Sequence, residues 1–599
     1  KKPPLSIGFL LFGGCFFAFG QSADTTFFRR QFTQIQALLD SANYDQALRQ
    51  SQDALLVILE ENPPRHDEFK AQCLLFLGNA FSEKGDLEAA RQQYQEALKI
   101  TTKIKSGKHQ LHAQALNDLA EFFYQKKDWQ QAETLHRQAL ALRRQLFGEQ
   151  HPDVAKSLNN LGNCFFAQAN YAEAIAWHER ALRLRQKLLQ PNHPHLAASH
   201  NNLGNCFLLT ADFEKAAAHF QQSLAIRQAV FGKEHPQTAQ AHNNLGNCFA
   251  ALGERQKAEQ HYRRALEIRQ KKLGKSHPQV AAVLENLGDL RLEEGDCITA
   301  LDFFRQALAI QSAAQGEQNI ATASLWHKTG RCLQCEGEFR AAADRHLKAL
   351  PVFSAAYGEK SPIVAGLQMS AGNCFLEMND LDRALDFYKK ASRVFQLKSA
   401  SRSDRATLET NLGLVFLKKN DPAQALRHFQ NAQKMLATPP AASPLELAEN
   451  LKNQGTALSR LARHEQAQTL FDQALRLLAK NFPGGFISPE ALEIQSEKAA
   501  ALLRQTKAAG DETHLSESLK LSERSSAGKR KSNLSESLKL SERSARAFDL
   551  ALAWADTLRL NLAASAARQR WVERHFSLFH GAVEIYYIRW KQTGDPAHL

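Results

Sequence analysis

The sequence predicts an all-α protein whose helices stack as an α-solenoid of helix–turn–helix repeats. Three observations predict this fold: a small residue that recurs every forty-two residues, apolar residues at helical spacing within each interval, and further small residues at fixed distances from the first. A unit of this length cannot bury its apolar face alone, so neighbouring units stack to form a continuous core. The recurring residues, here called the ladder positions, are Gly78, Ala120, Gly162, Gly204, Gly246, Gly288, Gly330, Gly372, Gly413 (one residue early) and Gly455.

The repeat unit is clearest between residues 152 and 193. Pro152 suits the first position of a helix, where its missing N–H is not needed, and apolar residues follow at helical spacing up to Phe166. Asn170 interrupts this pattern, and a second apolar pattern runs from Tyr171 to Leu188. The interval therefore predicts two antiparallel helices joined by a short turn.

Two more small residues in each repeat predict close packing of the second helix, because larger side chains there would overpack the contact by about 1–3 kcal/mol. Twelve residues after the ladder position stand Ala90, Ala132, Ala174, Ala216, Ala258, Ala300, Ala342, Ala384, Ala425 and Ala467; seven residues further on stand Ala97, Ala139, Ala181, Ser223, Ala265, Ala307, Ala349, Ala391, Ala432 and Ala474. Between them lies a bulky position: Tyr94, His136, His178, Phe220, Tyr262, Phe304, His346, Tyr388, Phe429 and Phe471. We assign the ladder residues, such as Gly162, Gly204, Gly246 and Gly288, and these small residues to repeat packing.

The charges are mixed along the chain rather than collected in one block. The formal net charge is +13, from 75 basic and 62 acidic residues. We interpret them as solvated helix faces, because a nucleic-acid-binding surface more often shows a basic stripe with interleaved aromatic residues. The pattern disfavours nucleic acid as a partner.

Residues 1–23 have the pattern of a secretory signal peptide: Lys1 and Lys2, an apolar run from Leu5 to Phe19, and small residues up to Ala23. The pattern predicts export to a periplasm, a cell surface or the medium, with no membrane span after cleavage. Two alternatives stay open: lipidation at Cys15, and a buried or frayed N-terminal segment.

The nine cysteines would suggest disulfides in an exported protein, but their spacing argues against them. Equivalent positions in neighbouring repeats are about 8–10 Å apart, beyond the Cα limit of about 7 Å for a disulfide. We interpret Cys332 and Cys335 as structural, because no second pair completes a zinc site. The cysteines that follow a ladder glycine by two residues, and that we place in the core, are Cys164, Cys206, Cys248, Cys332 and Cys374.

The repeats resemble the tetratricopeptide repeat, with its Leu-Gly, aromatic and two-alanine signature. Their period, the Asn-Asn-Leu-Gly-Asn-Cys-Phe run and the Gly-x-x-His-Pro linker are similar to the kinesin-light-chain type; the linker occurs at Gly148–Pro152, Gly232–Pro236 and Gly274–Pro278. The resemblance implies a right-handed superhelix. We expect a degenerate capping repeat over residues 24–64 and about ten repeats over residues 65–485.

Asparagines on the first helix of each repeat are the candidate binding residues. They stand one position before the leucine and one position after the glycine of the ladder: Asn160, Asn163, Asn202, Asn205, Asn244, Asn247 and, as a partial copy, Asn286. Residues three apart share a helix face, and the resemblance implies that this face lines a concave groove. An amide both donates and accepts hydrogen bonds, which suits the backbone of an extended peptide. The alternative is that these side chains cap or bridge neighbouring helices.

Metal and catalytic chemistry find little support in the sequence. His151, His193, His235 and His277 recur once per repeat, and a spacing of about 10 Å excludes a shared ion with bonds of about 2 Å. We expect loop histidines, no metal and no cofactor. The chain has no phosphate-binding loop and no nucleophile elbow, so no catalytic residue is assigned.

The periodicity fades beyond Gly485. Residues 486–505 predict one more helix, residues 506–544 a solvated linker or a marginal helix, and residues 545–599 a tail of amphipathic helices. The tail resembles the junction between tetratricopeptide arrays and a CHAT domain, the caspase-like peptidase fold of bacterial proteins. Its His and Cys would lie beyond Leu599, so we expect a longer protein.

These observations predict an exported bacterial scaffold that binds extended segments of a protein or peptide partner, with regulation of a CHAT-type peptidase as a further expectation. Two alternatives remain: an adaptor of the kinesin-light-chain type in the cytoplasm, and an enzyme whose catalytic domain follows Leu599.

Overall fold

A computed structural model describes residues 25–61, 67–104, 109–395, 401–437, 443–481, 489–519, 543, 545–547 and 549–553. The expected signal peptide, the CHAT-like junction from residue 554 onward, and residues 520–542 of the expected linker lie outside the described residues. Within the described part the chain is helical and holds no strand.

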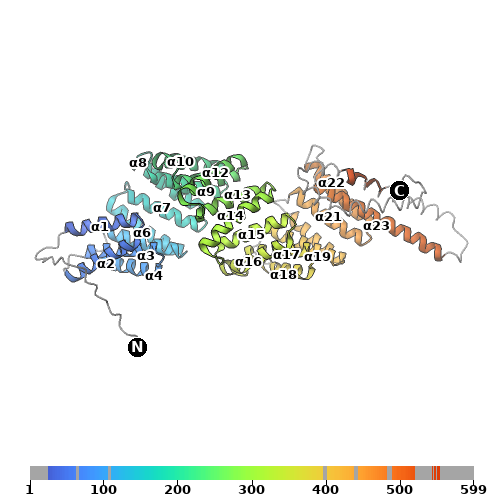
Figure 1. Cartoon of the computed structure of the whole chain (residues 1–599), viewed down its shortest axis with the longest axis horizontal. Helices are drawn as coiled ribbons and strands as arrows, with labels where there is room; N and C mark the ends of the chain where they lie inside the picture. Colours follow the sequence, from blue (N-terminus) through green and yellow to red (C-terminus); the bar gives the residue numbers. More distant parts are fainter. Residues whose placement is uncertain are drawn as a thin grey trace, which may run out of the picture. The chain divides into compact units, whose positions relative to one another are not determined.

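The helices follow one another in pairs along the chain (Figure 1). Their bounds are α1 (Thr25–Asp40), α2 (Tyr44–Glu61), α3 (Asp67–Glu83), α4 (Leu87–Lys103), α5 (Gln110–Gln125), α6 (Trp129–Phe147), α7 (Pro152–Ala167), α8 (Tyr171–Leu188), α9 (Pro194–Leu209), α10 (Phe213–Phe231), α11 (Pro236–Ala251), α12 (Arg255–Leu273), α13 (Pro278–Glu293), α14 (Cys297–Gln315), α15 (Ile320–Cys335), α16 (Phe339–Tyr357), α17 (Pro362–Glu377), α18 (Leu381–Phe395), α19 (Arg402–Lys418), α20 (Pro422–Leu436), α21 (Pro444–Arg460), α22 (His464–Asn481) and α23 (Pro489–Leu519).

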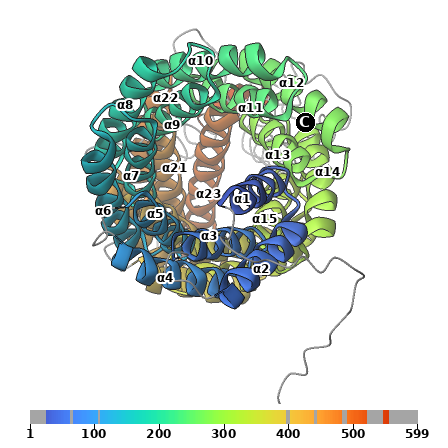
Figure 2. The same cartoon turned by 90° about the vertical axis from the view of Figure 1, so that its left-hand side faces the viewer.

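Tandem helix pairs packed in series confirm the predicted α-solenoid. The chain divides into two compact units inside α13, after Asn286. Within the first unit, Figure 2 shows the first helices of the pairs, α5, α7, α9 and α11, on the inner side of a curve, and the second helices, α6, α8, α10 and α12, on its outer side. The candidate asparagines all belong to first helices.

At each ladder glycine a side-chain ring packs directly on the helix backbone and leaves no room for a Cβ atom. A Cβ on Gly204 would lie 2.6 Å from Cε1 of Phe220, and one on Gly246 would lie 2.4 Å from Cε1 of Tyr262. The same relationship joins every other ladder glycine to the bulky residue of its repeat. Both sets of predicted small residues on the second helices are also fully buried, with 0% exposure. In the structure these small residues therefore lie in close packing contacts.

The turn inside each repeat has a fixed backbone conformation. The residue seven positions after the ladder residue has a positive φ in each of these repeats, and it is Gly85, Lys127, Ala169, Ala211, Gly253, Gly295, Gly337, Asn379, Asn420 or Ala462. The next residue is the N-cap of the second helix. Asp212, for example, accepts a hydrogen bond from the backbone N–H of Lys215, whereas Asn170, Glu254 and Glu338 make no such side-chain bond. These two positions end one helix and begin the next.

The linkers between repeats explain the His-Pro pairs. Gly148, Gly232 and Gly274 end the preceding helices with positive φ, and the following histidine caps the next helix. Nδ1 of His151 accepts from the backbone N–H of Asp153 at 3.1 Å; His193, His235 and His277 accept in the same way from the residue two positions on. These histidines are helix caps.

The last described helix differs in length from the sequence prediction. It begins at Pro489 and continues to Leu519, so its last turns occupy the first part of the expected linker, residues 506–544. Proline at its start and the absence of glycine or proline before Gly510 allow the helix to run on.

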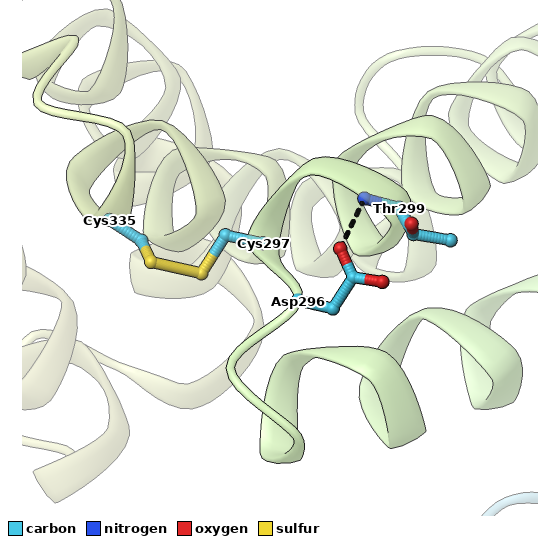
Figure 3. Close-up of a disulfide and its surroundings, with 4 residues drawn as sticks. All are labelled: Asp296, Cys297, Thr299 and Cys335. Carbon is cyan, nitrogen blue, oxygen red and sulfur yellow. Dashed lines mark hydrogen bonds between the residues drawn. A yellow bond between two sulfur atoms is a disulfide. The ribbon is translucent and has the colours of Figure 1, made fainter. Parts of the chain in front are cut away.

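One disulfide corrects the sequence interpretation of the cysteines. Cys297, the first residue of α14, is bonded to Cys335, the last residue of α15, with their Cα atoms 6.4 Å apart (Figure 3). The spacing argument compared the same position in successive repeats, whereas this bond joins different positions of two repeats. Cys332 and the other four core cysteines are free and buried, as predicted.

Four periodic arginines also correct the interpretation of the charges as solvated faces. Arg143, Arg185, Arg227 and Arg269 are at most 6% exposed and lie forty-two residues apart on second helices. Nη1 of Arg185 donates to the carbonyl oxygen of His195 at 3.1 Å and to the hydroxyl of Ser199 at 2.7 Å. Each of the others donates to the equivalent carbonyl of the following repeat. They join each second helix to the start of the next first helix.

Candidate functional site

The candidate asparagines form a continuous amide surface on the inner helices of the first unit. Asn160 and Asn163 lie on α7, Asn202 and Asn205 on α9, Asn244 and Asn247 on α11, and Asn286 on α13. All seven side chains are half-buried. We call this surface the asparagine face.

Hydrogen bonds join the asparagine face from one repeat to the next. Nδ2 of Asn160 donates to Oδ1 of Asn117 at 3.0 Å, and Nδ2 of Asn244 donates to Oδ1 of Asn201 at 2.8 Å. Two of the bridges are bifurcated: Asn202 donates to Asn159 and Asn163, and Asn286 donates to Asn243 and Asn247. The alternative left open by the sequence, that these side chains bridge neighbouring helices, therefore applies to Asn160, Asn202, Asn244 and Asn286.

Two acceptors of these bridges, Asn163 and Asn247, are candidate residues, and the other four are not among the candidates of the sequence interpretation. Asn117, Asn159, Asn201 and Asn243 stand directly before the first candidate asparagine, or its equivalent, of each repeat. Their recurrence every forty-two residues was a visible signal. Their role depends on contact with the following repeat, which periodicity within one repeat does not show.

The bridges leave complementary groups unpaired on the asparagine face. Within the described part of the chain, no donor reaches Oδ1 of Asn160, Asn202, Asn244 or Asn286, and no acceptor reaches Nδ2 of Asn163, Asn205 or Asn247. None of these atoms is buried. Each inner helix from α7 to α11 thus presents a free carbonyl oxygen and, three residues later, a free amide N–H group.

Neutral histidine pairs lie behind the asparagine face, between the first and second helices. Nδ1 of His200 is 2.9 Å from Nδ1 of His219, and the same distance joins His242 to His261. Burial, followed by the neighbouring imidazole, lowers the pKa of His200 and of His242 to about 4. At neutral pH these rings add no charge to the face.

Few charged groups lie on or beside the face. Asp118 on α5 is buried, and burial raises the pKa of its carboxyl group, against the hydrogen bonds that it accepts from Gln114 and Asn117. Lys156 is exposed on α7. The carboxyl groups of Glu121 on α5 and Glu285 on α13 stand at the two ends of the series.

A second concave feature of the described residues lies away from the asparagine face. A pocket of about 640 Å³ lies among α4, α5 and α6, and its one acidic side chain, Asp128, caps α6 by accepting from the backbone N–H of Gln131. Among the described residues, no three His, Cys, Asp or Glu side chains are placed to hold a metal ion. None of the helices described here has the length and apolar character that crossing a membrane requires.

Several solved structures match parts of this chain. A putative kinesin light chain from Podospora anserina with nearly identical TPR-like repeats is 24% identical, covering 35% of this chain and 98% of its own, with a TM-score of 0.32. BtubC from P. vanneervenii is 21% identical over 46% of this chain and 92% of its own, with a TM-score of 0.27. The quorum sensor NprR from B. thuringiensis, in its apo form, is 10% identical over 61% of this chain and 98% of its own, with a TM-score of 0.47.

No curated protein sequence matches the chain significantly. A family model described as the tetratricopeptide repeat matches residues 35–103, 111–187, 153–229, 195–271, 237–313, 279–355 and 321–397. These matches span more than half of the chain and follow the helix pairs described above. The chain therefore belongs to the tetratricopeptide repeat family, whose fold is typical of scaffolds for protein–protein interaction.

Proposed function

We propose that the first unit binds an extended peptide segment of a partner protein along the asparagine face. The observation that carries this proposal is the free carbonyl oxygen and free N–H group that each of α7, α9 and α11 presents after the bridges are made. An extended peptide carries the complementary groups, one N–H donor and one carbonyl acceptor per residue.

The spacing of the repeats supports an extended ligand. Packed helices lie about 8–10 Å apart, and an extended chain advances about 3.3 Å per residue, so each inner helix meets a new peptide unit about every three residues. Because the groups offered are amides, recognition of the backbone would tolerate different peptide sequences.

The test is to select binders from a random nonapeptide library displayed on phage, using the full chain. A variant with Asn163→Ala, Asn205→Ala and Asn247→Ala removes the three free N–H groups, and we expect it to lose enrichment. The exposed amide of Gln306 on α14, in the second unit, provides a control, Gln306→Ala, that should retain it. Equal enrichment by both variants, with circular dichroism unchanged, would overturn the proposal.

Backbone recognition has a second test on the peptide itself. N-methylation of alternate backbone nitrogens removes N–H donors without changing side chains, so a selected peptide should lose at least tenfold in affinity by isothermal titration calorimetry. Unchanged affinity would show that side chains alone are recognised.

We also infer that the protein is exported. The Cys297–Cys335 disulfide supports this part of the proposal, because such bonds persist in oxidising compartments and are rare in the cytoplasm. Cell fractionation with mass spectrometry of the mature N-terminus tests it: recovery of reduced, uncleaved protein from the cytoplasm would favour the intracellular adaptor instead.

A further inference from the structure

The inner face of the first unit is almost free of charge where the asparagines lie. Six positions per helix share this face: two, three and six residues before the ladder glycine, and one, four and five residues after it. On α7, α9 and α11 these positions hold a single charged residue, Lys156. Charged residues make up 23% of the chain as a whole, so this face differs from the rest of the surface.

An apolar row runs beside the asparagines on these three helices. Its members stand three and four residues after the second asparagine of each helix, on the same side as that asparagine: Phe166, Ala167, Leu208, Leu209, Ala250 and Ala251. None of the six is buried, and Leu209 is 53% exposed. A large apolar side chain kept in solvent beside unpaired amides indicates a surface that a ligand covers.

The last position of this row is alanine or leucine only in these three repeats. The equivalent residue, five positions after the ladder residue, is exposed in the other repeats, where it is the disulfide-bonded Cys335 or a polar or charged residue: Glu83, Gln125, Glu293, Glu377, Lys418 and Arg460. Solvent exposure alone therefore favours a polar residue at this position. Ala167, Leu209 and Ala251 depart from that pattern in the same three repeats that carry the complete asparagine pairs.

We infer, on the basis of the proposed function, that the ligand is an uncharged extended segment of about six to nine residues with apolar side chains at alternate positions. Its backbone lies on the asparagines and every second side chain lies on the apolar row, because successive side chains of an extended chain point to opposite sides. Charged segments are disfavoured, because α7, α9 and α11 offer a single charged side chain, Lys156, on this face.

The composition of the selected nonapeptides tests this inference with the full chain. We expect peptides enriched in Leu, Ile, Val and Phe at alternate positions, and depleted of Asp, Glu, Lys and Arg by at least threefold relative to the unselected library. Selection of charged peptides that still depend on Asn163, Asn205 and Asn247 would overturn the inference and leave the proposed function standing. Failure to select any peptide would overturn both.

Variants of the apolar row provide a second test of the inference. Leu209→Glu and Ala251→Glu place the residue that other repeats carry at this position, so the fold is expected to remain intact. The double variant should bind a selected apolar peptide at least tenfold more weakly. The matched control is Ile298→Glu, since Ile298 is 63% exposed on the second helix α14 and lies outside the face. Equal loss in the control, or no loss in the double variant, would refute a role for the apolar row.

Discussion

The ring of Phe220 lies against the backbone of Gly204, where a Cβ would come within 2.6 Å of Cε1. Real Cβ atoms essentially never approach so closely, so Gly204→Ala must move the ring or the helix. We expect a loss of about 1–3 kcal/mol in the free energy of unfolding, measured by urea denaturation.

The chain contains its own control for this prediction. The ladder position of one repeat is Ala120, fully buried, and its bulky partner is the smaller ring of His136. Gly162 faces the imidazole of His178, so Gly162→Ala should cost less than Gly204→Ala. A larger loss at Gly162 would contradict the proposed dependence on ring size.

The turn residues provide a prediction with the opposite sign. Ala211 has φ of +59° and Gly253, at the same position of the next repeat, has φ of +74°. A left-handed conformation costs an L-residue about 1–2 kcal/mol, only partly offset by the greater entropy that glycine loses on folding. We expect Ala211→Gly to stabilise the chain by about 0.5–1 kcal/mol and Gly253→Ala to destabilise it by a similar amount, as read from unfolding midpoints.

The turn has open space around it, so the comparison of Ala211 with Gly253 reports backbone conformation alone. A Cβ on Gly253 would meet nothing within 4 Å, so no steric clash contributes to its substitution. If the two variants shift stability in the same direction, backbone conformation does not control this turn.

The sequence predicted what one repeat determines by itself. Pro152, the ladder glycines and the alanines of the second helix mark local helix boundaries and close contacts, and the structure places them as expected. The missed features all join different positions of two repeats: Asn244 to Asn201, Arg185 to His195 and Cys297 to Cys335. Periodicity shows that such residues recur, but the distance between their side chains depends on how far each repeat is turned from the last.

Buried histidines make stability depend on pH. The ring of His178 is 1% exposed, and burial, followed by the charge of Arg185, lowers its pKa to about 4. The unfolded chain binds this proton near pH 6.5, whereas the folded chain binds it only near pH 4. The free energy of unfolding is therefore highest above about pH 6.5 and falls as the pH is lowered from 6.5 to 4. The loss should reach about 3 kcal/mol at most.

Two exchanges of ring type test the contribution of His178. His178→Phe copies Phe220 of the following repeat, and should reduce the fall in unfolding free energy between pH 7 and pH 4. Phe220→His should increase it, since that ring is equally buried. If the free energy of unfolding falls equally with pH in the wild type and both variants, these rings are not the source of the acid sensitivity.

The disulfide predicts a response to reductant. Cys297 and Cys335 are 38 residues apart in sequence. Closing a loop of that length lowers the entropy of the unfolded chain, which raises the free energy of unfolding by about 2–4 kcal/mol. Dithiothreitol should therefore lower the thermal midpoint of the wild type, and the Cys297→Ala, Cys335→Ala double variant should melt at the reduced midpoint with or without reductant. Cys374, free and buried in the second unit, supplies the control: Cys374→Ala should keep the full response to dithiothreitol. A wild-type midpoint that reductant leaves unchanged, with mass spectrometry showing both thiols free, would mean that this bond does not stabilise the second unit.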